Sequence, residues 1–336
     1  MVEGGLVERS LAGSSVAEGL KRRAAPLVER LAVIGPGLIG SSILRAARET
    51  GLARTLVTTD ANPAVRERVR ELGLADEVAP TSAEAAAGTD IVIICVPVGA
   101  IASVAGEIAD RLKPGAIVSD VGSVKASVID KAGPLLPASV HLIPAHPVAG
   151  TEYSGPDAGF ATLFVNRWSI VTPPENADPS AVATVAALWE ALGANVEFMT
   201  AQHHDLVLAI TSHVPHLIAY NIVGTAADLE AVTQSEVIKF SAGGFRDFTR
   251  IASSDPTMWR DVFLNNKDAV LEMLGRFNED IAALARAIRW GDGEALFDLF
   301  TRTRAIRRNI IDLGQETAEP DFGRHTRGKD QQAAGQ

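Results

Sequence analysis

The stretch Leu31-Ala-Val-Ile-Gly35-Pro-Gly37-Leu-Ile-Gly40 decides the fold of the first half of the chain. Four aliphatic residues predict a buried strand, and a Gly-X-Gly-X-X-Gly motif follows at once and opens a helix. In that setting the first glycine makes the tight turn, the second leaves room for a pyrophosphate, and the third lets helix and strand pack closely. The free N–H groups of the first helical turn favour phosphate. We therefore predict a dinucleotide-binding motif, with a purely structural glycine turn as the alternative. Its predicted cofactor contacts are Gly35, Pro36, Gly37, Leu38, Ile39 and Gly40.

Asp60 stands twenty residues beyond Gly40, at the end of the predicted second strand. A carboxylate there accepts hydrogen bonds from the ribose hydroxyls of NAD and repels the 2′-phosphate of NADP. Arg66 and Arg68 lie downstream and are the residues that could serve a phosphate instead. The sequence favours NAD over NADP.

The pattern along the chain predicts an α/β domain followed by an all-α domain. Short aliphatic runs alternate with helix-period segments from Arg30 to about Thr200, which is typical of a Rossmann-type parallel sheet with crossover helices. The predicted strands are Leu31–Ile34, Leu56–Thr59, Asp90–Val96, Ala116–Ser119, His141–Ala145 and Ser169–Thr172, with Asn195–Met199 as a candidate edge strand. The predicted helices of this half are Ile39–Thr50, Pro63–Leu72, Val98–Leu112, Val124–Leu136 and Ser180–Leu192.

After Thr200 the spacing of apolar residues is helical. We predict four segments: a disordered extension over residues 1–29, a nucleotide-binding domain over 30–200, a helical substrate and dimerisation domain over 201–314, and a disordered tail over 315–336. The broad apolar faces favour a homodimer, although large helices can also cover each other within one chain.

Charge and composition narrow the partners and the compartment. The 336 residues include 31 basic and 41 acidic side chains, so the formal net charge of −10 disfavours nucleic acid and anionic membranes. No stretch approaches the ~20 apolar residues that span a bilayer, and no secretory signal is visible. The single cysteine, Cys95, cannot form an internal disulfide. We expect a cytoplasmic protein with a small-molecule substrate and no membrane partner.

Ligands in an open parallel sheet bind outside the carboxyl ends of the strands, where two predicted loops begin. The first contains Val96 and Pro97, and the second contains Gly122, Ser123 and Lys125. These residues are expected to border the cofactor, and Lys125 could supply positive charge. Ser123 could hydrogen-bond a substrate hydroxyl or a catalytic imidazole, or it could be a plain helix N-cap.

His146 also follows a predicted strand, next to the predicted cofactor cleft. An imidazole has the intrinsic pKa, about 6.5, to accept a proton as hydride leaves the same carbon. We therefore predict His146 as the general base. His141, near the start of that strand, is more consistent with a structural role.

A second group of histidines lies in the helical half, in Thr211-Ser-His213-Val-Pro215-His216. A proline inside a helix removes one N–H bond and clashes with the carbonyl four residues back, so Pro215 should open the helix near Thr211. His213 and His216 are candidates for the floor of a site, or else buried core histidines. We expect no metal, because no carboxylate or cysteine accompanies them at a ligand spacing. His203 and His204, at a predicted helix start, are expected to cap the helix or to be exposed.

Arg250 is the candidate clamp for a substrate carboxylate, because a planar guanidinium suits bidentate pairing better than an ammonium. Asp247, three residues earlier, could hold its side chain in place. A surface ion pair of little energy is the alternative. The preceding Gly243 and Gly244 favour a shaped loop over a plain helical face.

The ordered set of these motifs resembles the prephenate/arogenate dehydrogenase family of tyrosine biosynthesis, from about Arg30 to Leu313. The residues that carry the resemblance are Gly35-Pro-Gly-Leu-Ile-Gly40, Cys95-Val-Pro97, Ser119-Asp-Val-Gly-Ser-Val-Lys125, His146-Pro-Val-Ala-Gly-Thr-Glu152, Ser212-His-Val-Pro-His216 and Phe245-Arg-Asp-Phe-Thr-Arg250. The resemblance implies a nucleotide-binding domain, a helical dimerisation domain, and NAD(P)-dependent oxidative decarboxylation of a cyclohexadienyl substrate.

The resemblance also implies roles for single residues. His146 matches the catalytic histidine, Ser123 the serine that orients it, and Arg250 the arginine that grips a carboxylate. Further substrate contacts implied by the matching motifs are His216, His213, Lys125, Thr151, Glu152, Asp247 and Trp259. Two other readings stay open: a 3-hydroxyacid dehydrogenase with Lys239 or Lys267 as its catalytic lysine, and a non-catalytic NAD-binding sensor.

Overall fold

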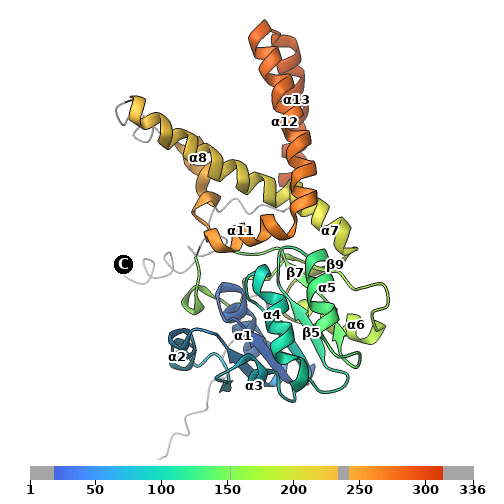
Figure 1. Ribbon diagram of the computed structural model, residues 1–336. Coiled ribbons are helices and arrows are strands. Elements are labelled where there is room, and N and C mark those ends of the chain that lie inside the picture. Colours follow the sequence, from blue (N-terminus) through green and yellow to red (C-terminus); the bar gives the residue numbers. More distant parts are fainter. Residues whose placement is uncertain (1–18, 152, 234–241, 313–336) are drawn as a thin grey trace, which may run out of the picture. The chain divides into compact units, whose positions relative to one another are not determined.

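The computed structural model describes residues 19–151, 153–233 and 242–312 (Figure 1). The chain forms two compact units, Met1–Met273 and Leu274–Gln336, and their boundary falls inside one long helix. The first unit holds the sheets and most of the helices. The described part of the second unit consists of the rest of that helix and one more.

A six-stranded parallel sheet is the centre of the first unit, with the strand order β3-β2-β1-β4-β5-β6. Strand β1 pairs with β2 on one side and with β4 on the other, so the strand order reverses beside the glycine motif. The strands are β1 (Val28–Ile34), β2 (Ala53–Thr59), β3 (Glu77–Val78), β4 (Ile91–Ile94), β5 (Ile117–Asp120) and β6 (His141–Leu142). The predicted Rossmann-type fold is confirmed, and the two-residue β3 is the strand that the aliphatic pattern missed.

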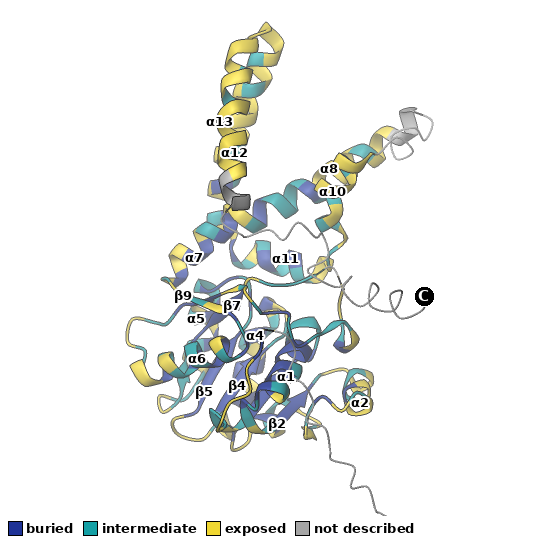
Figure 2. Ribbon diagram, turned by 180° about the vertical axis from the view of Figure 1, so that it is seen from behind, coloured by how far each residue is buried: buried dark blue, intermediate teal, exposed yellow. Residues whose placement is uncertain are grey.

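Helices cover both faces of this sheet. Successive side chains of each strand point to opposite faces, and both faces are apolar, so each is buried in its own core. Leu31 and Val33 of β1 enter the core shared with α1 (Leu38–Thr50) and α6 (Pro179–Ala191). Ala32 and Ile34 enter the core shared with α4 (Val98–Ile108) and α5 (Ala126–Ala132). The buried strands are dark blue in Figure 2. The remaining short helices of this half are α2 (Pro63–Glu71), α3 (Ser82–Ala86), η1 (Ala109–Arg111), η2 (Gly133–Leu135) and η3 (Pro156–Ala158).

The predicted strand His141–Ala145 is wrong as a single element. The chain changes sheets at Pro144: the Ile143 N–H donates to the Val118 carbonyl of the large sheet, and the Pro144 carbonyl accepts the N–H of Thr172, which directly follows a strand of a second sheet. Proline has no N–H for the ladder, so one strand cannot continue through it. The second sheet has the order β7-β8-β9, with β7 (Ala145–Pro147) antiparallel to β8 (Trp168–Val171), and β9 (Asn195–Phe198) parallel to β8. His146 therefore lies within a short strand, opposite Ile170.

Helices follow from Thr200, whose side chain caps the first of them. They are α7 (Ala201–Leu208), η4 (Ala209–His213), α8 (Val214–Thr233), α10 (Gly243–Thr249), η5 (Arg250–Ser253), α11 (Pro256–Asn265), α12 (Lys267–Trp290) and α13 (Gly293–Asp312). The segment η4 is one wide π-helical turn directly before Pro215, which confirms the opening predicted there. In Figure 1, α7 and α11 lie over the edge of the sheet where α4 and α5 begin.

The N-terminal extension is shorter than expected. Leu20 is buried in the core that α1 and α6 share, and the Arg23 N–H donates to the Thr50 carbonyl. The prediction of disorder is therefore wrong for residues 19–29, because an apolar side chain there finds a packing site. Residues 1–18 and the tail 315–336 lie outside the described residues.

Residues 201–229 form a helical stretch that is long and apolar enough, by length and composition, to cross a membrane. No such stretch was predicted from the sequence. The same test is passed by core helices of soluble proteins. Here the stretch carries buried polar side chains, His204, Asp205 and His213, which contact other parts of the first unit.

Candidate active site

The glycine motif has the geometry of a phosphate-binding turn. Gly35 has a φ of +89°, which L-residues with side chains rarely adopt. A Cβ on Gly40 would come within 2.4 Å of the Gly35 carbonyl oxygen, so helix α1 can approach the turn this closely only with glycine there. A Cβ on Gly37 would meet nothing within 4 Å, and no side chain caps the helix. The residues present thus fit a pyrophosphate over the start of α1.

Asp60 follows β2 at the same edge of the sheet and is partly buried. One carboxylate oxygen accepts the Asn62 N–H at 2.8 Å. Arg66 donates to the carbonyls of Asp60 and Ala61, and Arg68 pairs with Asp157 at 2.6 Å. Both arginines that could have served a 2′-phosphate therefore have protein partners.

The two loops predicted to border the cofactor lie at the carboxyl ends of β4 and β5. Pro97 is the N-cap of α4, with Val96 partly buried before it, and the Gly122 N–H donates to Asp120 at 2.8 Å. Ser123 is partly buried. It is not the N-cap of α5, because that helix begins at Ala126 with Lys125 as its N-cap.

Lys125 does not present its charge to the ligand site, contrary to the prediction from the sequence. Its side chain is fully buried, forms an ion pair with Asp120, and donates to the Ala145 carbonyl at 2.9 Å. Burial lowers the pKa of Lys125 and raises the pKa of Asp120, while their mutual attraction opposes both shifts. Lys125 therefore fixes the backbone directly before His146, and its charge is balanced within the protein.

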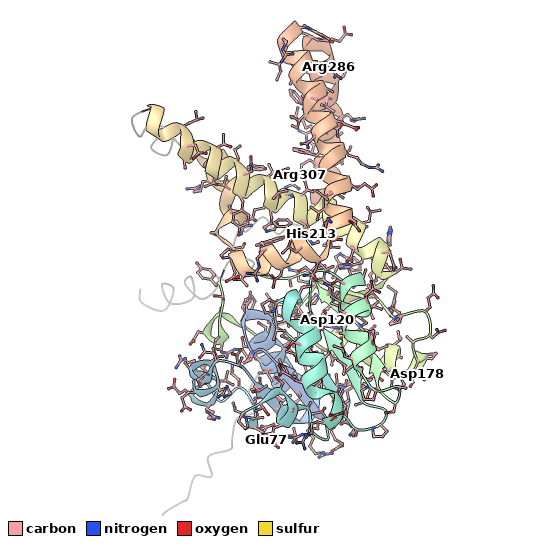
Figure 3. The ribbon with its side chains drawn as sticks, in the orientation of Figure 1. Glu77, Asp120, Asp178, His213, Arg286 and Arg307 are labelled. Carbon is pink, nitrogen blue, oxygen red and sulfur yellow. The ribbon has the colours of Figure 1, made fainter. Side chains whose placement is uncertain are left out.

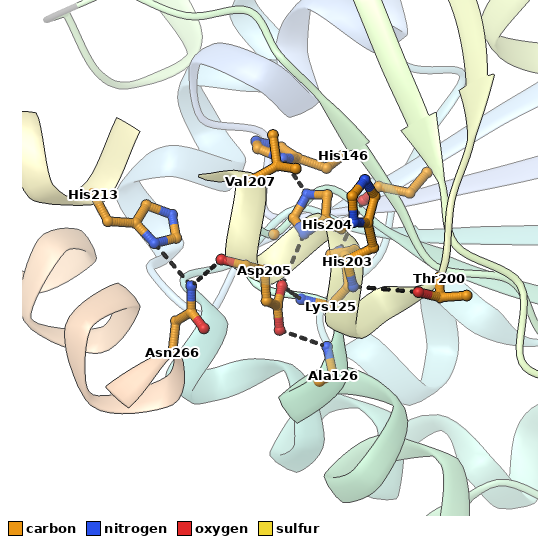
Figure 4. Close-up of polar contacts among 12 residues, drawn as sticks. Lys125, Ala126, His146, Thr200, His203, His204, Asp205, Val207, His213 and Asn266 are labelled. Atoms are coloured by element: carbon orange, nitrogen blue, oxygen red, sulfur yellow. Dashed lines mark hydrogen bonds and ion pairs between the residues drawn. The ribbon is translucent and has the colours of Figure 1, made fainter. Parts of the chain in front are cut away.

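His146 is the first member of a chain of three buried side chains (Figure 4). Its Nδ1 lies 2.8 Å from Nε2 of His204, whose Nδ1 lies 2.8 Å from Oδ1 of Asp205. Burial holds the pKa of His146 well below its usual range, and the electrostatic effect of His204, Lys125 and His213 acts in the same direction. Burial also lowers the pKa of His204, to about 2. Both rings are therefore neutral at ordinary pH.

The expectation that His204 caps a helix or is exposed is wrong, while its neighbour His203 is exposed. The backbone N–H of His203 donates to the Thr200 hydroxyl at 3.2 Å, while the His203 side chain is exposed and the His204 side chain is buried. Sequence reasoning also missed Asp205. The dipeptide His204-Asp205, at the start of the most apolar helix pattern in the chain, was the signal.

His213 joins the same network from the π turn. The Asn266 amide donates to the Asp205 carbonyl at 2.8 Å and to Nδ1 of His213 at 3.0 Å. Burial lowers the pKa of His213 to about 4. Its Nε2 is buried and has no hydrogen-bond partner among the described residues. Figure 3 shows His213 in the helical layer and Asp120 in the sheet below it.

His216 lies one turn further along α8 and stacks on the Trp259 ring, with centroids 3.6 Å apart. Burial lowers its pKa, and the charge of Arg250 adds to that shift. Arg250 begins η5 and is exposed. The structure therefore brings His146, His213, His216, Trp259 and Arg250 into one continuous neighbourhood.

The remaining predicted site residues are Asp247, Thr151 and Glu152. Asp247 is exposed and pairs with Arg246 at 3.5 Å, so it does not hold Arg250 as expected. The Thr151 hydroxyl accepts the Tyr153 N–H at 3.3 Å. Glu152 lies outside the described residues, as does Lys239.

Comparison with known families matches the chain to both domains of one family. Residues 43–198 match "Prephenate dehydrogenase, nucleotide-binding domain", and residues 200–302 match "Prephenate dehydrogenase, dimerization domain". The chain belongs to the prephenate dehydrogenase family. Within this family, the chain is 42% identical over 279 residues to the cyclohexadienyl dehydrogenase of Zymomonas mobilis, covering 83% of this chain and 95% of that protein. It is 32% identical over 295 residues to the prephenate dehydrogenase of Bacillus subtilis, covering 88% of this chain and 79% of that protein.

Solved structures of this family have the same fold. The prephenate dehydrogenase of A. aeolicus, in complex with hydroxyphenyl propionate and NAD+, superposes with a TM-score of 0.79 at 30% identity. The alignment covers 84% of this chain and 98% of that one. The arogenate dehydrogenase of Synechocystis superposes with a TM-score of 0.71 at 27% identity, over 83% of this chain and 99% of that one.

Proposed function

We propose that this protein catalyses the NAD-dependent oxidative decarboxylation of prephenate to 4-hydroxyphenylpyruvate and CO2, of arogenate to tyrosine, or of both. The observation that carries the proposal is the setting of His146. Its imidazole is buried and neutral and contacts His204, and Lys125 binds the carbonyl of the preceding residue, Ala145. It lies in the same neighbourhood as His213, His216 and Arg250. The relatives named above act on this class of substrate according to their names.

In the proposed reaction His146 is the general base. The O–H proton of the ring C4 hydroxyl moves to its imidazole, and a C4 carbonyl forms as the C4–H bond breaks and its electron pair leaves as hydride. Loss of the C1 carboxylate as CO2 then returns an electron pair to the ring, which becomes an aromatic phenolate and takes up a proton. The chain's task is alignment and removal of one proton, since aromatisation drives the rest.

The remaining residues bind and orient the reactants. Arg250 is suited to a substrate carboxylate, because its guanidinium is exposed and close to His216. The start of α1 and Asp60 would hold the pyrophosphate and the ribose of NAD. When bound, NAD+ supplies the hydride acceptor.

A steady-state comparison tests the proposal. Purified protein is assayed with prephenate and arogenate, each with NAD+ and NADP+, and His146→Asn is assayed beside it with NAD+ binding measured by fluorescence. We expect turnover of at least one substrate with NAD+, and its loss in His146→Asn with NAD+ binding retained. Reduction of NAD+ with a 3-hydroxyacid, but with neither cyclohexadienyl substrate, would contradict the proposal.

The cofactor assignment has its own variant. Asp60→Ser removes the carboxylate that accepts the ribose hydroxyls, so we expect weaker NAD+ binding and a smaller preference over NADP+. An unchanged ratio of kcat/KM for the two cofactors would contradict the role of Asp60.

A further inference from the structure

We propose that His204 and Asp205 are positioning residues that fix the tautomer of His146, so that its Nε2 carries the lone pair that accepts the substrate proton. The inference rests on the proposed function, because it gives His146 the role of base. It concerns a residue pair that neither the motifs nor the resemblance singled out.

The Asp205 carboxylate is held in place by backbone N–H groups. Its Oδ1 accepts the Lys125 N–H at 2.7 Å, and its Oδ2 accepts the Ala126 N–H at 3.0 Å. Both N–H groups belong to the start of α5, where no side chain of that helix acts as a cap. Burial raises the pKa of Asp205, and these two donors oppose the shift. A carboxyl group with both oxygens accepting backbone N–H bonds is held in its charged, acceptor-only form.

The proton between Asp205 and His204 belongs to the imidazole of His204. The carboxylate accepts, so Nδ1 of His204 must donate across the 2.8 Å contact. A neutral imidazole carries one N–H only, and burial keeps His204 neutral. Nε2 of His204 is then an acceptor.

The acceptor role of Nε2 of His204 determines the tautomer of His146 in the same way. Its Nδ1 lies 2.8 Å from the acceptor nitrogen of His204, so the Nδ1 of His146 carries the proton and donates. The other nitrogen, Nε2, is left with its lone pair, which is what a general base needs. A hydrogen-bond donor in place of the Asp205 carboxylate would reverse the direction of both hydrogen bonds. Nε2 of His146 would then carry the proton and could not act as the base.

The contact also spans the two halves of the first unit. His146 and Lys125 belong to the sheet domain, whereas His204 and Asp205 are on α7, and 58 residues separate the two imidazoles in sequence. The tautomer of His146 that can act as a base therefore depends on the packing of α7 against the sheet domain. A role limited to stability would need no particular tautomer.

The test compares three variants with the wild type. His204→Leu removes the acceptor for His146 Nδ1, His204→Gln keeps an acceptor oxygen near the place of Nε2, and His203→Leu changes the exposed neighbour as the matched control. In His204→Leu we expect kcat to fall about 100-fold or more, within the range that general-base catalysis contributes. The KM values for substrate and NAD+ should change less than about threefold. His204→Gln should recover at least a tenfold part of the loss, and His203→Leu should match the wild type.

A spectroscopic measurement keeps the inference separate from the proposed function. Nitrogen-15 NMR of histidine-labelled protein, assigned with His146→Asn, should show Nδ1 of His146 protonated and Nε2 unprotonated in the wild type at pH 7.5. A proton on Nε2, or an unchanged kcat in His204→Leu, would overturn the inference even in an active enzyme. If the wild type turned over neither substrate, the proposed function would fail, while the tautomer measurement would still decide this inference.

Discussion

The pKa of the His146 imidazole sets the pH range in which the proposed reaction can run. Burial lowers that pKa most, and the electrostatic effect of His204, Lys125 and His213, which face the ring from α7, the β5–α5 loop and η4, lowers it further. The neutral ring is the base, so activity is lost only when the pH falls below the lowered value. We expect kcat/KM to stay level from pH 8 down through 6.5 and to decline only at lower pH. An acid limb with a midpoint at or above 6.5, measured where the protein stays folded, would contradict this.

At the same scale, Arg250 should act on binding more than on chemistry. Arg250→Gln removes a charge-assisted hydrogen bond of about 1.5–3 kcal/mol, which corresponds to about 10- to 100-fold in KM. The contact exists in ground state and transition state alike, so kcat should change little. Arg246→Gln, at the exposed neighbour that pairs with Asp247, is the control. A large fall in kcat at unchanged KM would place Arg250 in the chemical step instead.

Gly37, the N-cap of α1, and Gly40, in the first turn of that helix, are expected to differ in their effects on NAD+ binding and on stability. A Cβ on Gly37 meets nothing within 4 Å, whereas a Cβ on Gly40 would press on the Gly35 carbonyl at 2.4 Å. Gly37→Ala should therefore keep the stability of the wild type and lose about tenfold or more in NAD+ affinity, because its methyl group occupies the pyrophosphate space. Gly40→Ala should cost about 1–3 kcal/mol of unfolding free energy, as overpacking does.

Urea denaturation and NAD+ titration of both variants measure the two effects. Each variant serves as the other's control, because the same methyl group is added at either end of one turn. A Gly37→Ala protein that binds NAD+ like the wild type would mean that the space above α1 is not the pyrophosphate site.

The sequence could predict most elements of the first unit, because aliphatic runs and helical periods report local burial directly. It could also predict that Pro215 opens the helix, since that effect acts within one turn. It could not predict the charge balance of Lys125 with Asp120 or the contact of His146 with His204, because both depend on how separate segments dock. Pro144 is visible in the sequence, but the change of sheet there could not be predicted, because the pairing partner of the following strand lies in a distant segment.

The second unit exposes several large apolar side chains. Most residues from 274 to 308 are exposed (Figure 2), and the exposed fractions of Trp290 and Phe297 are 74% and 69%. Ile288 and Phe300 are exposed too. Exposed apolar patches mark interaction surfaces, and the family domain that matches residues 200–302 is described as a dimerization domain. We propose that these helices form the interface of a homodimer.

Phe297 and Phe300 lie three residues apart on one face of α13, so a two-fold interface would bury four of these rings. At about 1.5–3 kcal/mol for each ring, they contribute about 6–12 kcal/mol, which is comparable to the roughly 8 kcal/mol of a micromolar dimer. Replacing both Phe297 and Phe300 with Glu also adds negative charge to a chain that already carries a formal −10, so the two subunits would repel each other.

We expect this double variant to sediment as a monomer at concentrations where the wild type is a dimer. Arg302→Glu, at an exposed position away from that face, changes the net charge by the same two units and should leave the dimer intact. A double variant that still sediments as a dimer would move the interface away from α13, whereas dissociation in both variants would show that charge alone governs assembly.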